Sequence, residues 1–160
     1  MDITNIIEED NFLKLKQYIK NGGDVNCDIE GEGSLLFFAL RKKCSYELIE
    51  FLIESGADIG YYDSYGVGIF DEAIDLGDIN LIKYLIYEKR VDINKTNRDS
   101  KLTPLMLASC YGLLNVVKLL VENGADINAR DKLGLSAKDY SRKMLQKNVL
   151  EYLDKIEWII

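Results

Sequence analysis

The side chains of this chain that could do chemistry are carboxylates, which gather in two places, Glu8-Glu9-Asp10 and Asp71-Glu72. Paired carboxylates can serve as general acid and general base. Neither cluster has a nucleophile or a metal-binding residue beside it, and we interpret both as solvated helix faces. The chain has no histidine, which removes the commonest general base, the triads built on it and every imidazole zinc site. We therefore predict a protein that is not an enzyme and that uses no metal and no cofactor.

Two other motifs carry little chemistry. Gly66-Val67-Gly68 begins like a phosphate-binding loop but lacks the third glycine and a preceding strand. Cys27, Cys44 and Cys110 are far apart and form no Cys-x-x-Cys pair, which is typical of a reducing compartment. The N-terminus is acidic where a signal peptide is basic, and no apolar run approaches the ~18 residues of a membrane span. We expect a cytoplasmic protein that does not bind membranes.

The charge is unevenly distributed along the chain. The net charge is −7 over 160 residues. Residues 1–80 carry 17 acidic and 6 basic side chains, a balance of −11, whereas residues 81–160 carry 10 acidic and 14 basic ones, a balance of +4. Because Lys and Arg drive binding to phosphate backbones, the acidic total argues against a nucleic-acid partner.

An internal repeat determines the architecture. Asp24, Asp58, Asp92 and Asp126 are spaced 34 residues apart, and helical apolar positions upstream keep the same period. Each aspartate lies within one of four related segments: Gly22-Gly23-Asp24-Val25-Asn26, Gly56-Ala57-Asp58-Ile59-Gly60, Arg90-Val91-Asp92-Ile93-Asn94 and Gly124-Ala125-Asp126-Ile127-Asn128.

One repeat shows the order of elements. Thr103-Pro104-Leu105 offers an N-cap hydroxyl followed by a proline at the first helical position, so a helix is predicted to begin there. A second helix is predicted over 115–123, and Gly124 ends it in a left-handed conformation. Each unit therefore reads as a helix, a tight turn, a helix and an extended stretch. Such units bury their apolar faces only by stacking, which predicts an all-α solenoid.

These motifs closely resemble an ankyrin repeat. The resemblance covers nearly the whole chain and implies about five stacked helix-turn-helix units with projecting β-hairpin-like turns. The predicted helix pairs lie near 3–20, 34–54, 68–89, 103–123 and 135–157. We expect a single domain over 1–160, divided into an N-terminal capping pair, three repeats and a C-terminal capping pair at 1–27, 28–61, 62–95, 96–129 and 130–160.

Two departures from the family pattern carry predictions. Arg90 stands where three other units have glycine, and a non-glycine residue at positive φ costs on the order of 1 kcal/mol, so either the loop is rebuilt locally or the third unit is softer than its neighbours. Phe37, Asp71, Met106 and Asp139 occupy the usual histidine position of the family, and we expect the polar lattice made by that histidine to be absent.

The resemblance implies that the chain binds a protein through a concave groove formed by turn tips and the ends of the first helices. Tyr61, Tyr62 and Tyr65 cluster on one turn, and either an interface role or packing across the turn explains them. The candidate partner-binding residues are Glu30, Glu32, Arg41, Tyr62, Tyr65, Asp75, Leu76, Arg98, Lys101, Tyr111, Lys132 and Leu133.

Charge suggests which partner the groove accepts. The turns and first helices carry acidic side chains in the N-terminal half (Asp28, Glu30, Glu32, Asp63, Asp71, Glu72 and Asp75) and basic ones in the C-terminal half (Lys95, Arg98, Lys101, Arg130 and Lys132). This pattern favours a monomeric acidic inhibitor or immunity-type protein that masks a basic partner. A charged face that serves only solubility is an alternative, as are a general adaptor or host-directed effector and a non-catalytic regulatory subunit.

The C-terminal residues Ile156-Glu157-Trp158-Ile159-Ile160 are unusually apolar. We expect them to cap the open end of the array, with an anchor for a partner or a second copy as the alternative.

Overall fold

A computed structural model describes residues 2–157, so most of the C-terminal cap predicted at Ile156-Glu157-Trp158-Ile159-Ile160 lies outside the described residues. The chain divides into two compact units, unit 1 up to Asp63 and unit 2 from Ser64 onward. Unit 1 contains α1 (Ile3–Glu8), α2 (Phe12–Lys20), β1 (Asp28–Ile29), β2 (Gly33–Ser34), α3 (Leu35–Arg41) and α4 (Tyr46–Glu54). Unit 2 contains α5 (Ile69–Leu76), α6 (Ile79–Tyr87), α7 (Pro104–Cys110), α8 (Leu114–Glu122), α9 (Ala137–Lys143) and α10 (Lys147–Glu157).

In unit 1 the helices form two rows, with α1 against α3 and α2 against α4. Six consecutive residues of α3, from Leu35 to Leu40, are buried because this helix is covered on all sides. The Ser34 hydroxyl caps its first turn by accepting a hydrogen bond from the Phe37 N–H at 3.3 Å. The turn before α4 is held across the repeat, because the Asp10 carboxylate accepts from the backbone N–H of Ser45 at 3.1 Å.

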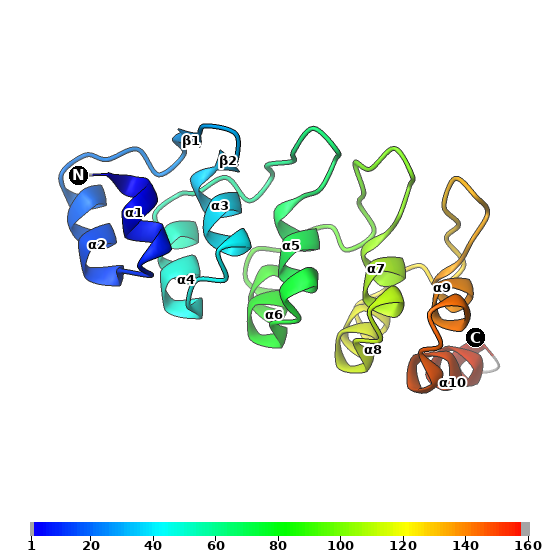
Figure 1. Cartoon of the computed structure of the whole chain (residues 1–160). Coiled ribbons are helices and arrows are strands. Elements are labelled where there is room, and N and C mark those ends of the chain that lie inside the picture. The colour runs from blue at the N-terminus through cyan, green and yellow to red at the C-terminus, as the bar shows by residue number, and fades with distance from the viewer. Residues whose placement is uncertain (1, 158–160) are drawn as a thin grey trace. The chain divides into compact units, whose positions relative to one another are not determined.

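In unit 2 the inner helices α5, α7 and α9 pack side by side, and the outer helices α6, α8 and α10 form the second row (Figure 1). The loops that lead into α7 and α9 project from the same edge of this unit. As the sequence predicts, Pro104 opens α7 and the Thr103 hydroxyl accepts from the Met106 N–H at 3.3 Å. The predicted helix pairs are confirmed, and α8 begins one residue earlier than expected.

The projecting turns are less regular than predicted. Within residues 2–157 a two-stranded sheet forms only between β1 and β2, which pair antiparallel with Asp28 opposite Ser34.

Arg90 has φ +53°, so a non-glycine residue does adopt the left-handed conformation at that helix end. Gly124, at the corresponding position, has φ +90°.

Asparagine side chains join neighbouring loops inside each unit, a link that the sequence reasoning missed. In unit 1 the Asn26 amide donates to the Gly56 carbonyl at 3.0 Å and accepts from the Asp58 N–H at 2.8 Å. In unit 2 Asn94 makes the same pair of bonds to Gly124 and Asp126, at 3.1 and 2.8 Å. The recurrent Asp-x-Asn spacing in the sequence could have indicated these asparagine bridges. Gly60 occupies the same register position and has no amide to make such a bridge.

Candidate functional site

One group of exposed acidic side chains in unit 1 lies on the hairpin formed by β1 and β2. Ile29 is buried and anchors the hairpin, and the Glu32 N–H donates to the Ile29 carbonyl at 2.8 Å. Asp28, Glu30 and Glu32 are exposed, and we name this group the acidic hairpin. Within residues 2–63 the acidic partners of the ion pairs are Glu8, Glu9 and Asp63. The acidic hairpin takes part in none of these pairs.

Arg41 and the tyrosines of unit 1 are held by packing. The Arg41 guanidinium lies 4.3 Å from the centre of the Phe37 ring and pairs with Asp63 at 3.3 Å. Tyr61 packs on the same ring, with centroids 5.2 Å apart, so packing across the turn explains Tyr61. Tyr62 is half-buried.

In unit 2 the ends of the inner helices bring Asp75 and Tyr111 together. Both residues are exposed, whereas Leu76 beside them is half-buried. The hydrogen bond to Asp75, with burial as a further cause, raises the pKa of Tyr111 to about 12. Asp75 is therefore close enough to Tyr111 to favour the protonated form of its hydroxyl.

The prediction that Asp71 lies on a solvated, acidic face is wrong. Asp71 is only 6% exposed, and its carboxylate accepts from the Gly68 N–H at 2.9 Å, which caps the start of α5. Its Oδ2 also lies 3.6 Å from Nε of Arg98. A carboxylate at this inward position stabilises helix α5 and its neighbouring loop, so Asp71 and the half-buried Arg98 neutralise each other and contribute little charge to the surface.

Aspartates at the family's histidine position thus take over a local capping role. Asp139, like Asp71, accepts from the backbone N–H of its N-cap residue, Ser136, at 3.0 Å. Hydrogen bonds from the backbone and hydroxyl of Ser136 lower the pKa of Asp139. The sequence analysis assigned no capping role to these two carboxylates, although an acidic residue three positions after an N-cap is the signal of a capping box.

The last tip of unit 2 is organised around buried Asp131. Its carboxylate accepts from the N–H groups of Leu133 and Leu135 at 2.9 and 2.8 Å and from the Tyr140 hydroxyl at 2.7 Å. Burial alone would raise the pKa of Asp131, but these hydrogen bonds together lower it. Lys132 and Leu133 lie on this tip and are exposed, as is Lys101 on the preceding tip. The Lys132 N–H donates to the Ser100 carbonyl at 2.8 Å, which joins the two tips.

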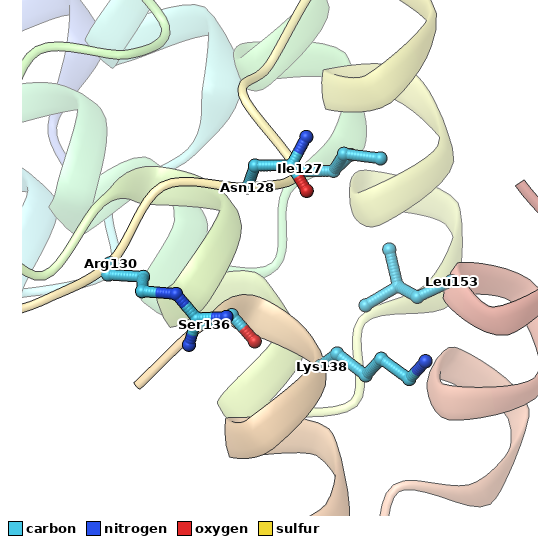
Figure 2. A pocket seen from close by; sticks show the side chains of 6 residues that line it. All are labelled: Ile127, Asn128, Arg130, Ser136, Lys138 and Leu153. Carbon is cyan, nitrogen blue, oxygen red and sulfur yellow. The ribbon is translucent and has the colours of Figure 1, made fainter. Parts of the chain in front are cut away.

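Two hollows of unit 2 are smaller than a typical ligand pocket. One of about 250 Å³ lies between Gly112 and the turn at 145–149. Figure 2 shows the other, of about 40 Å³, between the loop at Ile127 and the helices α9 and α10, with Arg130 and Lys138 at its edge. This volume holds a few water molecules, whereas ligand pockets measure roughly 300–1,000 Å³.

Among residues 2–157 no group of three or more His, Cys, Asp and Glu side chains is placed to hold a metal ion. No helix in this part of the chain is long and apolar enough to span a membrane.

The stacked helix pairs and projecting loops define a helical repeat protein. The family model for ankyrin repeats, in three copies, matches residues 36–131, and the chain belongs to the ankyrin-repeat family. Ankyrin repeats are protein-interaction modules and are generally not catalytic.

Several characterised proteins contain a similar stretch. Alpha-latrotoxin-Lg1a of Latrodectus geometricus is 32% identical over 136 residues, which is 84% of this chain and 10% of that protein. The E3 ubiquitin-protein ligase hecd-1 of Caenorhabditis elegans is 36% identical over 109 residues, 68% of this chain and 4% of the ligase. The ankyrin repeat and SAM domain-containing protein 6 of Rattus norvegicus is 37% identical over 82 residues, 51% of this chain and 9% of the relative. The chain thus spans a tenth or less of these relatives.

Proposed function

We propose that this chain binds a protein partner by its turn tips and inner helix ends, and that the acidic hairpin of unit 1 covers a basic patch on that partner and inhibits it. The observation that carries this proposal is the exposure of Asp28, Glu30 and Glu32 on a turn whose backbone is fixed by a strand pair and by buried Ile29.

The charge of unit 1 supports a basic partner. Residues 1–63 carry 13 acidic and 6 basic side chains, a balance of −7, whereas residues 64–160 carry 14 of each and are neutral. The net charge of the whole protein therefore resides in unit 1. A surface of one sign accelerates the encounter with a partner of the opposite sign and selects against partners of the same sign.

The remaining candidate residues supply contact area and orientation. Tyr111 presents an exposed aromatic ring beside Asp75, and Tyr, Trp and Arg dominate the energetics of protein interfaces. Tyr62 in unit 1 and Leu76 in unit 2 are half-buried and project little, whereas Arg41 is exposed although its guanidinium packs on the Phe37 ring.

Affinity capture from the native cell, repeated at low and high salt, tests this function. Glu30→Lys reverses a charge on the acidic hairpin, and Glu47→Lys makes the same change at an exposed position of α4 in the same unit. We expect a basic protein to be captured at low salt, to be lost with Glu30→Lys and to be retained with Glu47→Lys. Equal loss in the two variants, or a partner that is acidic, would contradict a specific role for the hairpin.

The inhibitory role needs a separate measurement on the captured partner. Adding the purified chain is expected to suppress the activity of the partner, and the Glu30→Lys variant is expected to suppress it less at equal concentration. Tight binding with no change in partner activity would indicate a tethering module and would refute inhibition.

A further inference from the structure

Two exposed apolar side chains of unit 2 occupy the same position on its first and third tips. Tyr65 and Leu133 are 81% and 80% exposed, and each lies three residues before the N-cap of an inner helix, Gly68 for α5 and Ser136 for α9. Ser100 holds the same position before α7, whose N-cap is Thr103. The tips of unit 2 therefore carry an apolar residue, a small polar residue and an apolar residue in sequence; we name Tyr65, Ser100 and Leu133 the tip row.

The backbone of the tip row is held in place. Gly66 approaches the next loop so closely that a Cβ atom would lie 2.2 Å from the Asn97 carbonyl oxygen. Ser100 and Lys132 share the backbone hydrogen bond already described, and Asp131 fixes the N–H of Leu133 at 2.9 Å. Little backbone freedom remains to be lost when a partner binds, and preorganisation of this kind strengthens binding.

Other exposed leucines of the chain lack this setting. Leu13 lies on outer helix α2 and Leu145 on the turn between α9 and α10, at 77% and 81% exposure. Single exposed apolar side chains are common on protein surfaces and need no special explanation. The tip row differs because two such residues recur at one structural position on linked, ordered loops.

Charge around the tip row indicates the chemistry of the occupant. Lys101 and Lys132 are exposed beside Ser100 and Leu133, and neither belongs to an ion pair of the described residues. Asp99 is the exposed acidic neighbour, while the Asp131 carboxylate is turned inward to its three hydrogen-bond donors. The exposed charge beside the tip row is therefore positive on balance, which favours an acidic partner segment.

The spacing of the repeats gives the length of this segment. Packed helices lie about 8–10 Å apart, so two repeats separate the two apolar tips by roughly 20 Å. An extended chain advances about 3.3 Å per residue, and roughly six residues cover that distance. We propose that the tip row binds an extended acidic segment of a protein, which places two large apolar residues about six positions apart against Tyr65 and Leu133. This inference rests on the proposed function, because it names the ligand of one part of the protein-binding surface.

Selection from a displayed library of random 16-residue peptides against the full chain tests the inference. We expect enriched peptides with two large apolar residues about six positions apart and acidic residues between them. The binding of one enriched peptide is then measured by fluorescence anisotropy. Leu133→Ser and Tyr65→Ser are each expected to weaken it at least tenfold, Lys132→Glu is expected to weaken it as well, and Asp99→Asn is expected not to weaken it.

Leu145→Ser is the matched control, because it removes an equally exposed leucine of unit 2 from outside the tip row. Circular dichroism melting curves of each variant separate loss of binding from loss of folding. The inference is overturned if no peptide is enriched, if enriched peptides lack the acidic two-anchor pattern, or if Leu133→Ser and Leu145→Ser weaken binding equally. Peptides that are basic and lost only with Glu30→Lys would refute the tip row while they support the acidic hairpin.

Discussion

Replacing Gly66 by alanine tests the close contact between two loops of unit 2. Gly66 has φ +74°, and an added Cβ would lie 2.2 Å from the Asn97 carbonyl oxygen and 2.7 Å from the Arg98 nitrogen. Both are backbone atoms, so no side chain can rotate away to make room. The Gly66→Ala chain must therefore move one loop away from the other.

Gly134→Ala provides the matched control. Gly134 has φ +77° on the last tip, and nothing lies within 4 Å of the position of its Cβ. Alanine in the left-handed conformation costs on the order of 1 kcal/mol, and the reduced freedom of the unfolded chain offsets part of that cost. We expect Gly134→Ala to lower the free energy of unfolding by about 0.5–1 kcal/mol.

Gly66→Ala has the same backbone strain and an added steric cost. Forcing extra atoms into a packed site typically costs about 1–3 kcal/mol. The two variants should therefore differ by about 1–3 kcal/mol, and since 1 kcal/mol corresponds to about 2–4 °C at this chain length, by several degrees in Tm. Urea and thermal unfolding followed by circular dichroism measure both quantities. Equal losses in the two variants would show that these loops are not in backbone contact and would remove one support of the tip row.

Three further substitutions test other parts of the structure. The Ser109 hydroxyl is fully buried and has no hydrogen-bond partner, so we expect Ser109→Ala to raise the free energy of unfolding by about 1 kcal/mol. Ser141→Ala is the control, because the buried Ser141 hydroxyl donates to the Ala137 carbonyl at 3.0 Å. We expect no such gain from this second substitution. Arg90 has φ +53°, so Arg90→Gly should relieve backbone strain and raise Tm by about 2 °C. A lower Tm would show that the flexibility of glycine in the unfolded chain outweighs that strain. The pKa of Asp131 is lowered in the folded chain, so its ionised form contributes stability above the unfolded pKa of about 3.9, and this contribution is lost as the pH falls through the folded pKa. Asp131→Asn should therefore destabilise the chain at pH 7 and reduce the loss of stability on acidification; a pH profile parallel to that of the unmodified chain would refute this linkage.

The sequence determined the repeat architecture because its signals are local. The 34-residue period, the Thr103-Pro104 helix start and the glycine at position 124 act through helix capping and backbone conformation, which neighbouring residues control. The period also placed Tyr65 and Leu133 on projecting tips, where the structure finds them exposed.

Only the tertiary structure decided which charges are available to a partner. Asp71 and Glu30 look equivalent in the sequence, yet Asp71 is buried against Gly68 and Arg98, while Glu30 is exposed on a hairpin tip. The difference depends on contacts between residues some 27 positions apart, which a local pattern does not encode. For the same reason the close contact at Gly66 was not predicted, because it arises where the loops of neighbouring repeats pack against each other. The carboxylate of Asp131 is held by partners within nine positions, on its own loop and on α9, and the sequence pattern did not indicate that this loop folds back onto α9.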